Sequence, residues 1–187
     1  MVKDQRQFGE WARRMRQLRA RAGACLFPEA VGVTCSKAAI GSHSLARSAM
    51  LKPIARRGHV YHLDADPHVL KQTGGFARYN LIGTQKASTF SGFCSEHDNS
   101  LFARIDEPID SADREVAFLL HYRALCREYY ARESALLYSA QRVGEHSEEL
   151  EKIWASGLKN GFGSLLDEKN TCDSALIKKD FPRSMLL

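Results

Sequence analysis

Six consecutive residues, Cys94 to Asn99, bring a thiol, an imidazole, a carboxylate and a carboxamide together in the string CSEHDN. Cys94 and His97 have the C-x-x-H spacing of a metal-ligand pair. We expect a helix to begin after Cys94, so that the sulfur in the turn and the imidazole one turn later can reach the same ion. A helix N-terminus also favours the thiolate, which is the form that ligates a metal. This pair constrains the fold, because two ligands cannot close a structural site and others must come from elsewhere.

The missing ligands are best sought among the upstream cysteines. Cys25 and Cys35 are the obvious second pair, since both lie in a segment, residues 24–43, whose proline and glycine break helix. A structural zinc site needs four nitrogen or sulfur ligands in a tetrahedron. The sequence therefore predicts one structural Zn²⁺ held by Cys25, Cys35, Cys94 and His97. The alternative is that the cysteines are small buried side chains and that His97 caps a helix.

Disulfide bonds are a weaker explanation of the cysteines. The chain holds five of them, an odd number, and its charged N-terminus does not resemble a secretory signal. We therefore expect a cytoplasmic protein, in which disulfides are rare. No apolar run has the length needed to cross a bilayer, so no membrane association is expected. Cys126 falls on the apolar stripe of a predicted helix and is expected in the core, whereas Cys172 lies in a tail with little pattern.

Positive charge is concentrated near the N-terminus. Residues 1–22 hold seven basic and two acidic side chains, a surplus equal to the net charge of +5 of the whole chain. Such a segment either meets DNA, RNA or an acidic partner protein, or is a solvated helix face. More basic residues follow His43. The candidate nucleic-acid contacts are Arg13, Arg14, Arg16, Arg19, Arg21, Arg47, Lys52, Arg56 and Arg57.

The hydrophobic periodicity predicts a helix-rich α+β protein. Its organisation is expected to be a basic amphipathic helix over 1–23, a core region over 24–108 and a helical region over 109–187. Helices are predicted over 4–22, 44–57, 111–142 and 147–158, and strands over 59–63 and 81–85. Pro53 should shorten the second helix, and residues 64–80 should form a loop. Ser95 and Asp98 have the spacing of a capping box at the start of a further helix.

His43 is the candidate for chemistry beyond metal binding. If a metal ties the upstream segment to Cys94, His43 is drawn toward Asp98 and Asn99. A neutral imidazole there can act as a general base on a water molecule. A hydrolytic Mg²⁺ would need oxygen ligands, and Asp98 is the nearest carboxylate. The alternatives are that His43 caps the following helix or replaces Cys25 as a zinc ligand.

The order of these motifs is a cysteine pair, then Ser42-His43, then Cys94-Ser95-Glu96-His97-Asp98-Asn99. Over residues 25–105 it resembles the HNH-type, or treble-clef, zinc-binding endonucleases, although Ser42 stands where that family has Asp or Glu. The resemblance implies a zinc-stabilised, treble-clef-like ββα unit between an N-terminal basic helix and long C-terminal helices. It also implies that His43 is the base, and that Asp98 or Asn99 positions a catalytic Mg²⁺ or Mn²⁺ or the substrate.

Two functions follow from these patterns. The first is a metal-dependent endonuclease that hydrolyses phosphodiesters in DNA or RNA. The second is a non-catalytic zinc-binding module for nucleic acid or a partner protein. The strings SHSLARSAMLKPIARRGHV and ASTFSGFCSEHDNSLF also resemble a group of uncharacterised bacterial proteins, some with an association to phage defence, and this implies such a role.

Overall fold

The computed structural model describes residues 25–28, 35, 38–64, 69, 72–109, 113–140 and 148–182. Within these residues the fold is α+β, as predicted, with two small antiparallel sheets and predominant helices. The predicted helix over 4–22 and its basic residues lie outside the described part. They include the predicted nucleic-acid contacts Arg13, Arg14, Arg16, Arg19 and Arg21.

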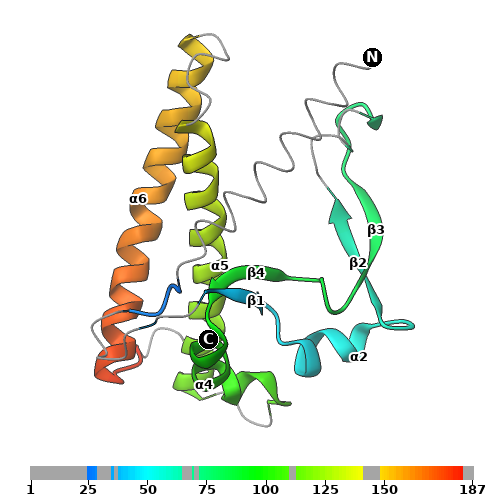
Figure 1. Ribbon diagram of the computed structural model, residues 1–187, viewed down its shortest axis with the longest axis vertical. Helices are drawn as coiled ribbons and strands as arrows, with labels where there is room; N and C mark the ends of the chain where they lie inside the picture. Colours follow the sequence, from blue (N-terminus) through cyan, green and yellow to red (C-terminus); the bar gives the residue numbers. More distant parts are fainter. Residues whose placement is uncertain are drawn as a thin grey trace.

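The first sheet and the helix after it form a strand–strand–helix unit. Strand β1 (Ile40–His43) pairs antiparallel with β4 (Thr89–Phe93), and helix α4 (Ser95–Asp106) begins two residues after β4. Figure 1 shows these strands lying across α5, with α4 beneath them. Neither strand is predicted from the sequence, because β1 is only four residues long and the pairing joins segments that lie more than 40 residues apart.

The residues between β1 and β4 form a separate hairpin on a short helical base. The base consists of η2 (Arg47–Leu51), a π-helical turn, and α2 (Lys52–Ile54). The predicted helix over 44–57 is therefore present but shorter, and Pro53 occupies the first turn of α2, where a proline is tolerated. Strand β2 (His59–Asp64) confirms the first predicted strand. Its partner β3 (Arg78–Gly83) begins three residues before the second predicted strand.

A two-residue turn connects the helical base to β2. Arg57 and Gly58 both have positive φ angles, 50° and 76°, and Arg56 and His59 exchange backbone hydrogen bonds of 2.9 and 3.0 Å across them. Tight hairpin turns of this hand require positive φ at both central positions, which glycine adopts without strain. The turn leaves the side chains of Arg56 and Arg57 exposed to solvent.

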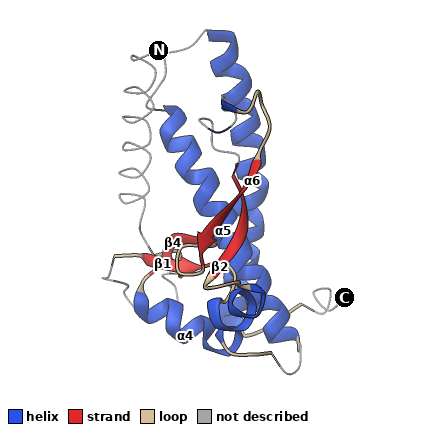
Figure 2. Ribbon diagram, turned by 90° about the vertical axis from the view of Figure 1, so that its right-hand side faces the viewer, coloured by secondary structure: helices blue, strands red, loops and turns tan. Residues whose placement is uncertain are grey.

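Two long helices pack side by side, and the first of them contacts strand β4. They are α5 (Arg114–Ala140) and α6 (Glu148–Lys178), and both views show them running alongside one another (Figures 1 and 2). None of the described helices combines the length and the apolar character needed to span a bilayer.

The prediction of a helix ending at residue 158 is wrong, because α6 continues for another 20 residues through two further glycines. Each glycine costs about 1 kcal/mol of helix propensity, and packing against α5 offsets this cost. Phe162 packs on Tyr129 with ring centroids 5.1 Å apart. A Cβ at Gly161 would lie 2.7 Å from Nη1 of Arg132, so the missing side chain makes room for α5.

One aromatic core joins β4 to helices α4, α5 and α6. Cys172, whose position could not be predicted, is buried in it, and Cys126 lies there as predicted. The buried members of this core are Phe90, Phe93, Phe102, Ile105, Val116, Phe118, Leu119, Tyr122, Leu125, Cys126, Tyr130 and Cys172. A smaller cluster of Leu51, Val60 and Ala87 lies where the β2–β3 hairpin meets its helical base.

Gly92 in β4 offers a test of this core. A Cβ at Gly92 would lie 2.2 Å from the ring of Phe90, which packs against Phe93 and Tyr130. We expect Gly92→Ala to lower the free energy of unfolding by about 1–3 kcal/mol, the usual cost of overpacking. Chemical denaturation measures this change. Gly41→Ala in β1 is the matched control, since no atom lies within 4 Å of its Cβ position, and equal stabilities of the two variants would contradict the packing.

Candidate metal centre and adjoining pocket

The four side chains predicted to bind zinc converge in the structure. The sulfurs of Cys25, Cys35 and Cys94 and a ring nitrogen of His97 all lie within 4.8 Å of one another, and none of the described cysteines forms a disulfide. Sγ of Cys25 is 3.3 Å from Nδ1 of His97. Three sulfurs and one imidazole nitrogen are a ligand set that fits one metal ion.

Cys94 caps the N-terminus of α4 and is also a member of the metal cluster. Its Sγ accepts a hydrogen bond of 3.5 Å from the backbone N–H of His97, which makes Cys94 the N-cap residue. The prediction that Ser95 caps this helix through a capping box is therefore wrong by one residue, since the sulfur already occupies the cap. The backbone N–H of Cys94 in turn donates to Sγ of Cys25 over 3.3 Å. Such N–H···S bonds stabilise negative charge on sulfur.

The pKa values of Cys94 and Cys25 are shifted in opposite directions from the ordinary value of a thiol. Burial alone would raise the pKa of Cys94, but hydrogen bonds from the N–H of His97, from the thiols of Cys35 and Cys25 and from the N–H of Glu96 together lower it. Burial raises the pKa of Cys25 to about 11. The surroundings of Cys94 thus favour the thiolate, the form that ligates a metal, whereas Cys25 would release its proton on binding one.

Contacts from β4 and α6 hold the segment that carries Cys25. The backbone N–H of Leu26 donates to the carbonyl of Gly92 over 2.7 Å. The ammonium of Lys169 donates to the carbonyl of Leu26 over 3.1 Å and to Asp173 over 2.6 Å. Lys169 is buried, and its pairing with Asp173 offsets the cost of placing an ammonium group inside the protein. This support leaves no local pattern in the sequence, because Lys169 and Leu26 are 143 residues apart.

The ring of His97 is held between the cluster and an aromatic side chain. Phe27 stacks on it with a centroid distance of 4.0 Å and an interplanar angle of 17°. Nδ1 faces Cys25, whereas Nε2 is buried and has no hydrogen-bond partner among the described residues. The ring is therefore oriented to present Nδ1 to an ion.

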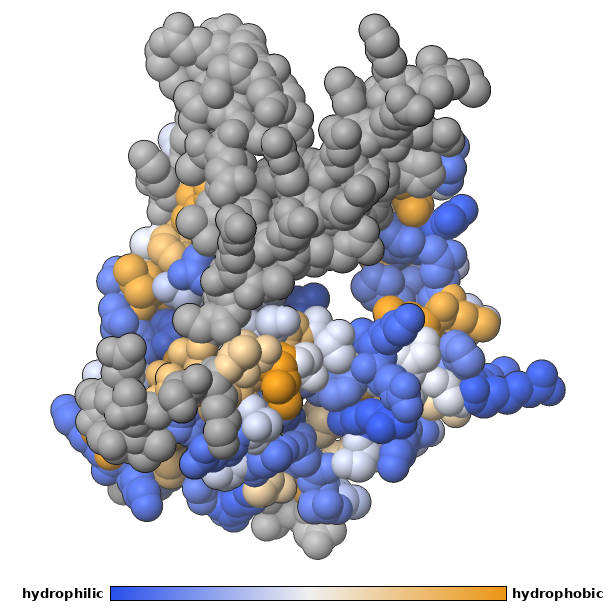
Figure 3. Space-filling model, in the orientation of Figure 1, coloured by the Kyte–Doolittle hydropathy of each residue, from blue (hydrophilic) through white to orange (hydrophobic). Residues whose placement is uncertain are grey.

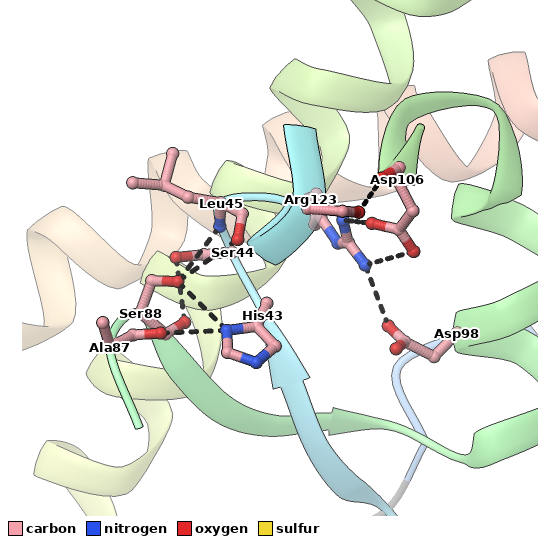
Figure 4. Close-up of polar contacts among 9 residues, drawn as sticks. His43, Ser44, Leu45, Ala87, Ser88, Asp98, Asp106 and Arg123 are labelled. Carbon is pink, nitrogen blue, oxygen red and sulfur yellow. Dashed lines mark hydrogen bonds and ion pairs between the residues drawn. The ribbon is translucent and has the colours of Figure 1, made fainter. Parts of the chain in front are cut away.

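A pocket lies next to the metal cluster, because its lining residue Asp98 directly follows His97 in α4. It has a volume of about 250 Å³ and lies between the end of β1, the helical base of the hairpin, and helices α4 and α5. Figure 4 shows its histidine between the Ala87–Ser88 turn and a group of one arginine and two aspartates. The lining residues are His43, Arg47, Ser48, Lys52, Asp98, Asp106 and Arg123.

His43 is held in one tautomer. Its Nδ1 is 2.9 Å from the carbonyl oxygen of Ala87 and 3.5 Å from Oγ of Ser88. A carbonyl oxygen can only accept, so Nδ1 carries the proton of the neutral ring. Nε2 then keeps a free lone pair, which is the arrangement that a general base requires. His43 is not a member of the metal cluster, which contains Cys25 instead.

Arg123 organises the carboxylates of the pocket. Its side chain is 2% exposed and lies over the ring of Phe102, 4.4 Å from the centroid. Nη1 donates to Asp106 over 2.6 Å, and Nη2 lies 3.5 Å from Oδ1 of Asp98. Oδ1 of Asp98 and Nε of Arg123 are both buried, and neither has a hydrogen bond among the described residues. Asp98 is therefore close to a positive charge but not saturated by it.

Removal of the Arg123 guanidinium should lower the free energy of unfolding. Arg123→Met leaves Asp98 buried beside an apolar side chain, and breaking a buried pair in this way costs about 3 kcal/mol or more. The free energy of unfolding, measured with urea, reports the loss. Arg104→Met is the matched control, because Arg104 also bridges two carboxylates, Asp113 and Glu115, but on the surface. Equal losses from the two variants would contradict the buried role of Arg123.

The remaining predicted site residues fall into two groups. Arg47 and Lys52 line the pocket, as their position after His43 suggested. Asn99 is exposed and does not line it, because adjacent residues of a helix point about 100° apart. Arg56 and Arg57 lie on the exposed turn before β2, outside the pocket lining.

Sequence reasoning missed three lining residues, which are Ser48, Asp106 and Arg123. Arg123 stands among apolar residues on the stripe of α5, and a lone charge on such a stripe is the signal that could have identified it. Comparisons of the chain with protein-family models, with curated proteins and with solved structures find no match.

Proposed function

We propose that Cys25, Cys35, Cys94 and His97 bind one structural Zn²⁺ and that the adjoining pocket hydrolyses phosphodiester bonds in nucleic acid. The ligand set supports zinc, because three cysteines and one histidine are a common structural zinc set, and a closed set of four protein ligands is typical of a structural ion. Zinc would supply a cross-link between the segment at Cys25 and the start of α4. That cross-link would fix the helix on which Asp98 is carried.

The orientation of His43 is the observation that carries the nuclease proposal. Its Nδ1–H is engaged by the carbonyl of Ala87, and the ring lines a pocket that also holds acidic and basic side chains. A histidine with an engaged Nδ1 and a free Nε2 can take a proton from a water molecule. Strand β1, the inserted hairpin with its base, strand β4 and helix α4 follow one another along the chain. The strand–strand–helix unit of β1, β4 and α4 supports the resemblance to HNH-type endonucleases, which implies a ββα unit.

The other pocket residues have roles that suit a phosphate substrate. Arg47 and Lys52 are exposed cations at its rim and would attract the phosphate backbone. Arg123 would hold Asp98 and Asp106 in place. The carboxylate of Asp98, whose Oδ1 lies 3.5 Å from Arg123 and accepts no hydrogen bond from the described residues, would be the ligand for Mg²⁺ or Mn²⁺. Such an ion would supply charge stabilisation at the phosphate.

Incubation of the purified protein with nucleic acid tests the proposal. We expect cleavage of DNA or RNA when Mg²⁺ or Mn²⁺ is added, and none when the added ion is omitted. Single-stranded and duplex forms of both nucleic acids should be compared. No cleavage of any of them with either ion would contradict the nuclease assignment.

A non-catalytic module is the second candidate function. One observation favours it: Asp98 lies 3.5 Å from Arg123, so this carboxylate already has a cationic neighbour without any added ion. This candidate predicts that the protein binds nucleic acid, or a partner protein, and leaves phosphodiester bonds intact. A role in phage defence rests on resemblance alone and stays a prediction.

A further inference from the structure

One face of the β2–β3 hairpin has no role in the pocket or in the core. The strand register pairs Tyr61 with Leu81 and Leu63 with Tyr79, so these four side chains share one face. Their exposed fractions are 73% for Tyr61, 60% for Leu81, 52% for Leu63 and 71% for Tyr79. Together with Phe76 they are five of the ten exposed large hydrophobic residues in the described part of the chain. Such a concentration marks a binding surface.

The opposite face of the hairpin anchors it beside the pocket. Val60 is buried against Leu51 and Ala87, and Ile82 packs on the same cluster. Leu51 ends the turn whose first residue lines the pocket, and the carbonyl of Ala87 holds His43. In Figure 1 the hairpin rises from this base, away from α5 and α6. A ligand on the exposed face would therefore be fixed relative to His43.

Charge indicates what kind of ligand this face attracts. Residues 44–88, which include the hairpin and its base, hold seven basic and two acidic side chains. Among these, Arg56 and Arg57 lie exposed in the turn before β2, whereas Arg78 lies opposite Asp64 on the other face of the hairpin. The space-filling view shows hydrophobic residues standing among strongly hydrophilic ones over this part of the molecule (Figure 3). Exposed aromatic rings within a positive surface are the combination by which proteins bind single-stranded nucleic acid.

We infer that Tyr61 and Tyr79 bind unpaired bases of a single-stranded DNA or RNA segment, which the hairpin presents to the pocket. The inference rests on the proposed function and specifies its substrate. The two rings are diagonal neighbours across the strands, at a separation of roughly 7–8 Å. This exceeds the spacing of about 3.4 Å per base along one strand of a duplex, so each ring takes a base of an extended strand. A duplex hides its base faces in the stack and should bind less tightly.

Fluorescence anisotropy with a labelled oligothymidylate tests the inference. The parent protein is the full chain with His43→Ala, which keeps the probe intact during titration. We expect Tyr61→Ala and Tyr79→Ala each to weaken binding roughly five- to 100-fold, the range for loss of one stacked base. Tyr61→Phe and Tyr79→Phe keep the ring and should bind within about twofold of the parent. All four variants should keep the parent's melting temperature, because both side chains are largely exposed.

The leucines of the same face provide the matched control. Leu63→Ala with Leu81→Ala removes apolar area but no ring, so a small change supports base stacking. A loss as large as that of the tyrosine pair would overturn the inference in favour of a protein partner. Unchanged binding after loss of both tyrosines, or equal affinity for duplex and single strand, would also overturn it.

The inference and the proposed function can fail separately. Cleavage that requires His43 but not the tyrosines would overturn the inference and leave the nuclease proposal intact. Binding of oligothymidylate that requires the tyrosines, in a wild-type protein that cleaves nothing, would support the inference and contradict the nuclease proposal.

Discussion

Cys94→Ser is expected to abolish zinc binding and to destabilise the strand–strand–helix unit. Cys94 would supply a zinc ligand, and serine removes its sulfur but keeps both an N-cap for α4 and the backbone N–H that donates to Cys25, so the loss reports the metal ligand. Zinc content should fall from about one ion per chain, the value for a single tetrahedral site, to near zero. A ligand present at a thousand times its Kd contributes about 4 kcal/mol to stability, and this contribution should be lost. Elemental analysis and thermal unfolding measure the two effects.

Cys126→Ser is the matched control for this substitution. Cys126 is also a fully buried thiol, but it lies in the aromatic core of α5 and outside the metal cluster. Its replacement should cost some stability through the buried hydroxyl and leave the zinc content at about one per chain. Equal zinc contents of the Cys94 and Cys126 variants would contradict the proposed ligand set.

His43→Ala is expected to lower the rate of phosphodiester cleavage by about 10²- to 10⁴-fold, the usual contribution of a general base. The zinc content and the melting temperature should not change, because His43 is half-buried and lies outside the metal cluster. Initial rates of cleavage with Mg²⁺ or Mn²⁺ provide the measurement. A loss of zinc together with activity would instead assign His43 a structural role.

The chain offers a close control for this variant in His59. Its Nδ1 also donates to a backbone carbonyl, that of Arg57, over 2.9 Å. His59 is exposed at the start of β2 and does not line the pocket. His59→Ala should therefore cleave at the wild-type rate. Full activity of His43→Ala, or an equal loss in both variants, would contradict the assignment of the base.

The sequence predicted the metal cluster because its spacing is local. Cys94 and His97 lie one helical turn apart, and this separation alone sets their common direction. The identity of the second pair followed from the small number of cysteines in the chain rather than from their spacing, which is longer than in common zinc knuckles. Periodicity also found β2 and α5, which are both long enough to show a clear pattern.

The features that escaped prediction depend on contacts between distant residues. Strands β1 and β4 are short, and their pairing crosses the whole hairpin insertion. The length of α6 depends on packing against α5, since glycine at 161 leaves room for Arg132. The pairing of Arg123 with Asp106 links two helices and leaves no local pattern. Propensity and periodicity describe neighbours along the chain, so they cannot report such contacts.

X-ray absorption at the zinc K-edge tests the proposed metal centre directly. We expect the purified wild-type protein to contain zinc with three sulfur ligands at about 2.3 Å and one nitrogen ligand at about 2.0–2.1 Å. These are the distances for Cys25, Cys35, Cys94 and His97 around one ion. A shell of oxygen and nitrogen without sulfur, or protein purified without any bound metal, would contradict a zinc-stabilised fold.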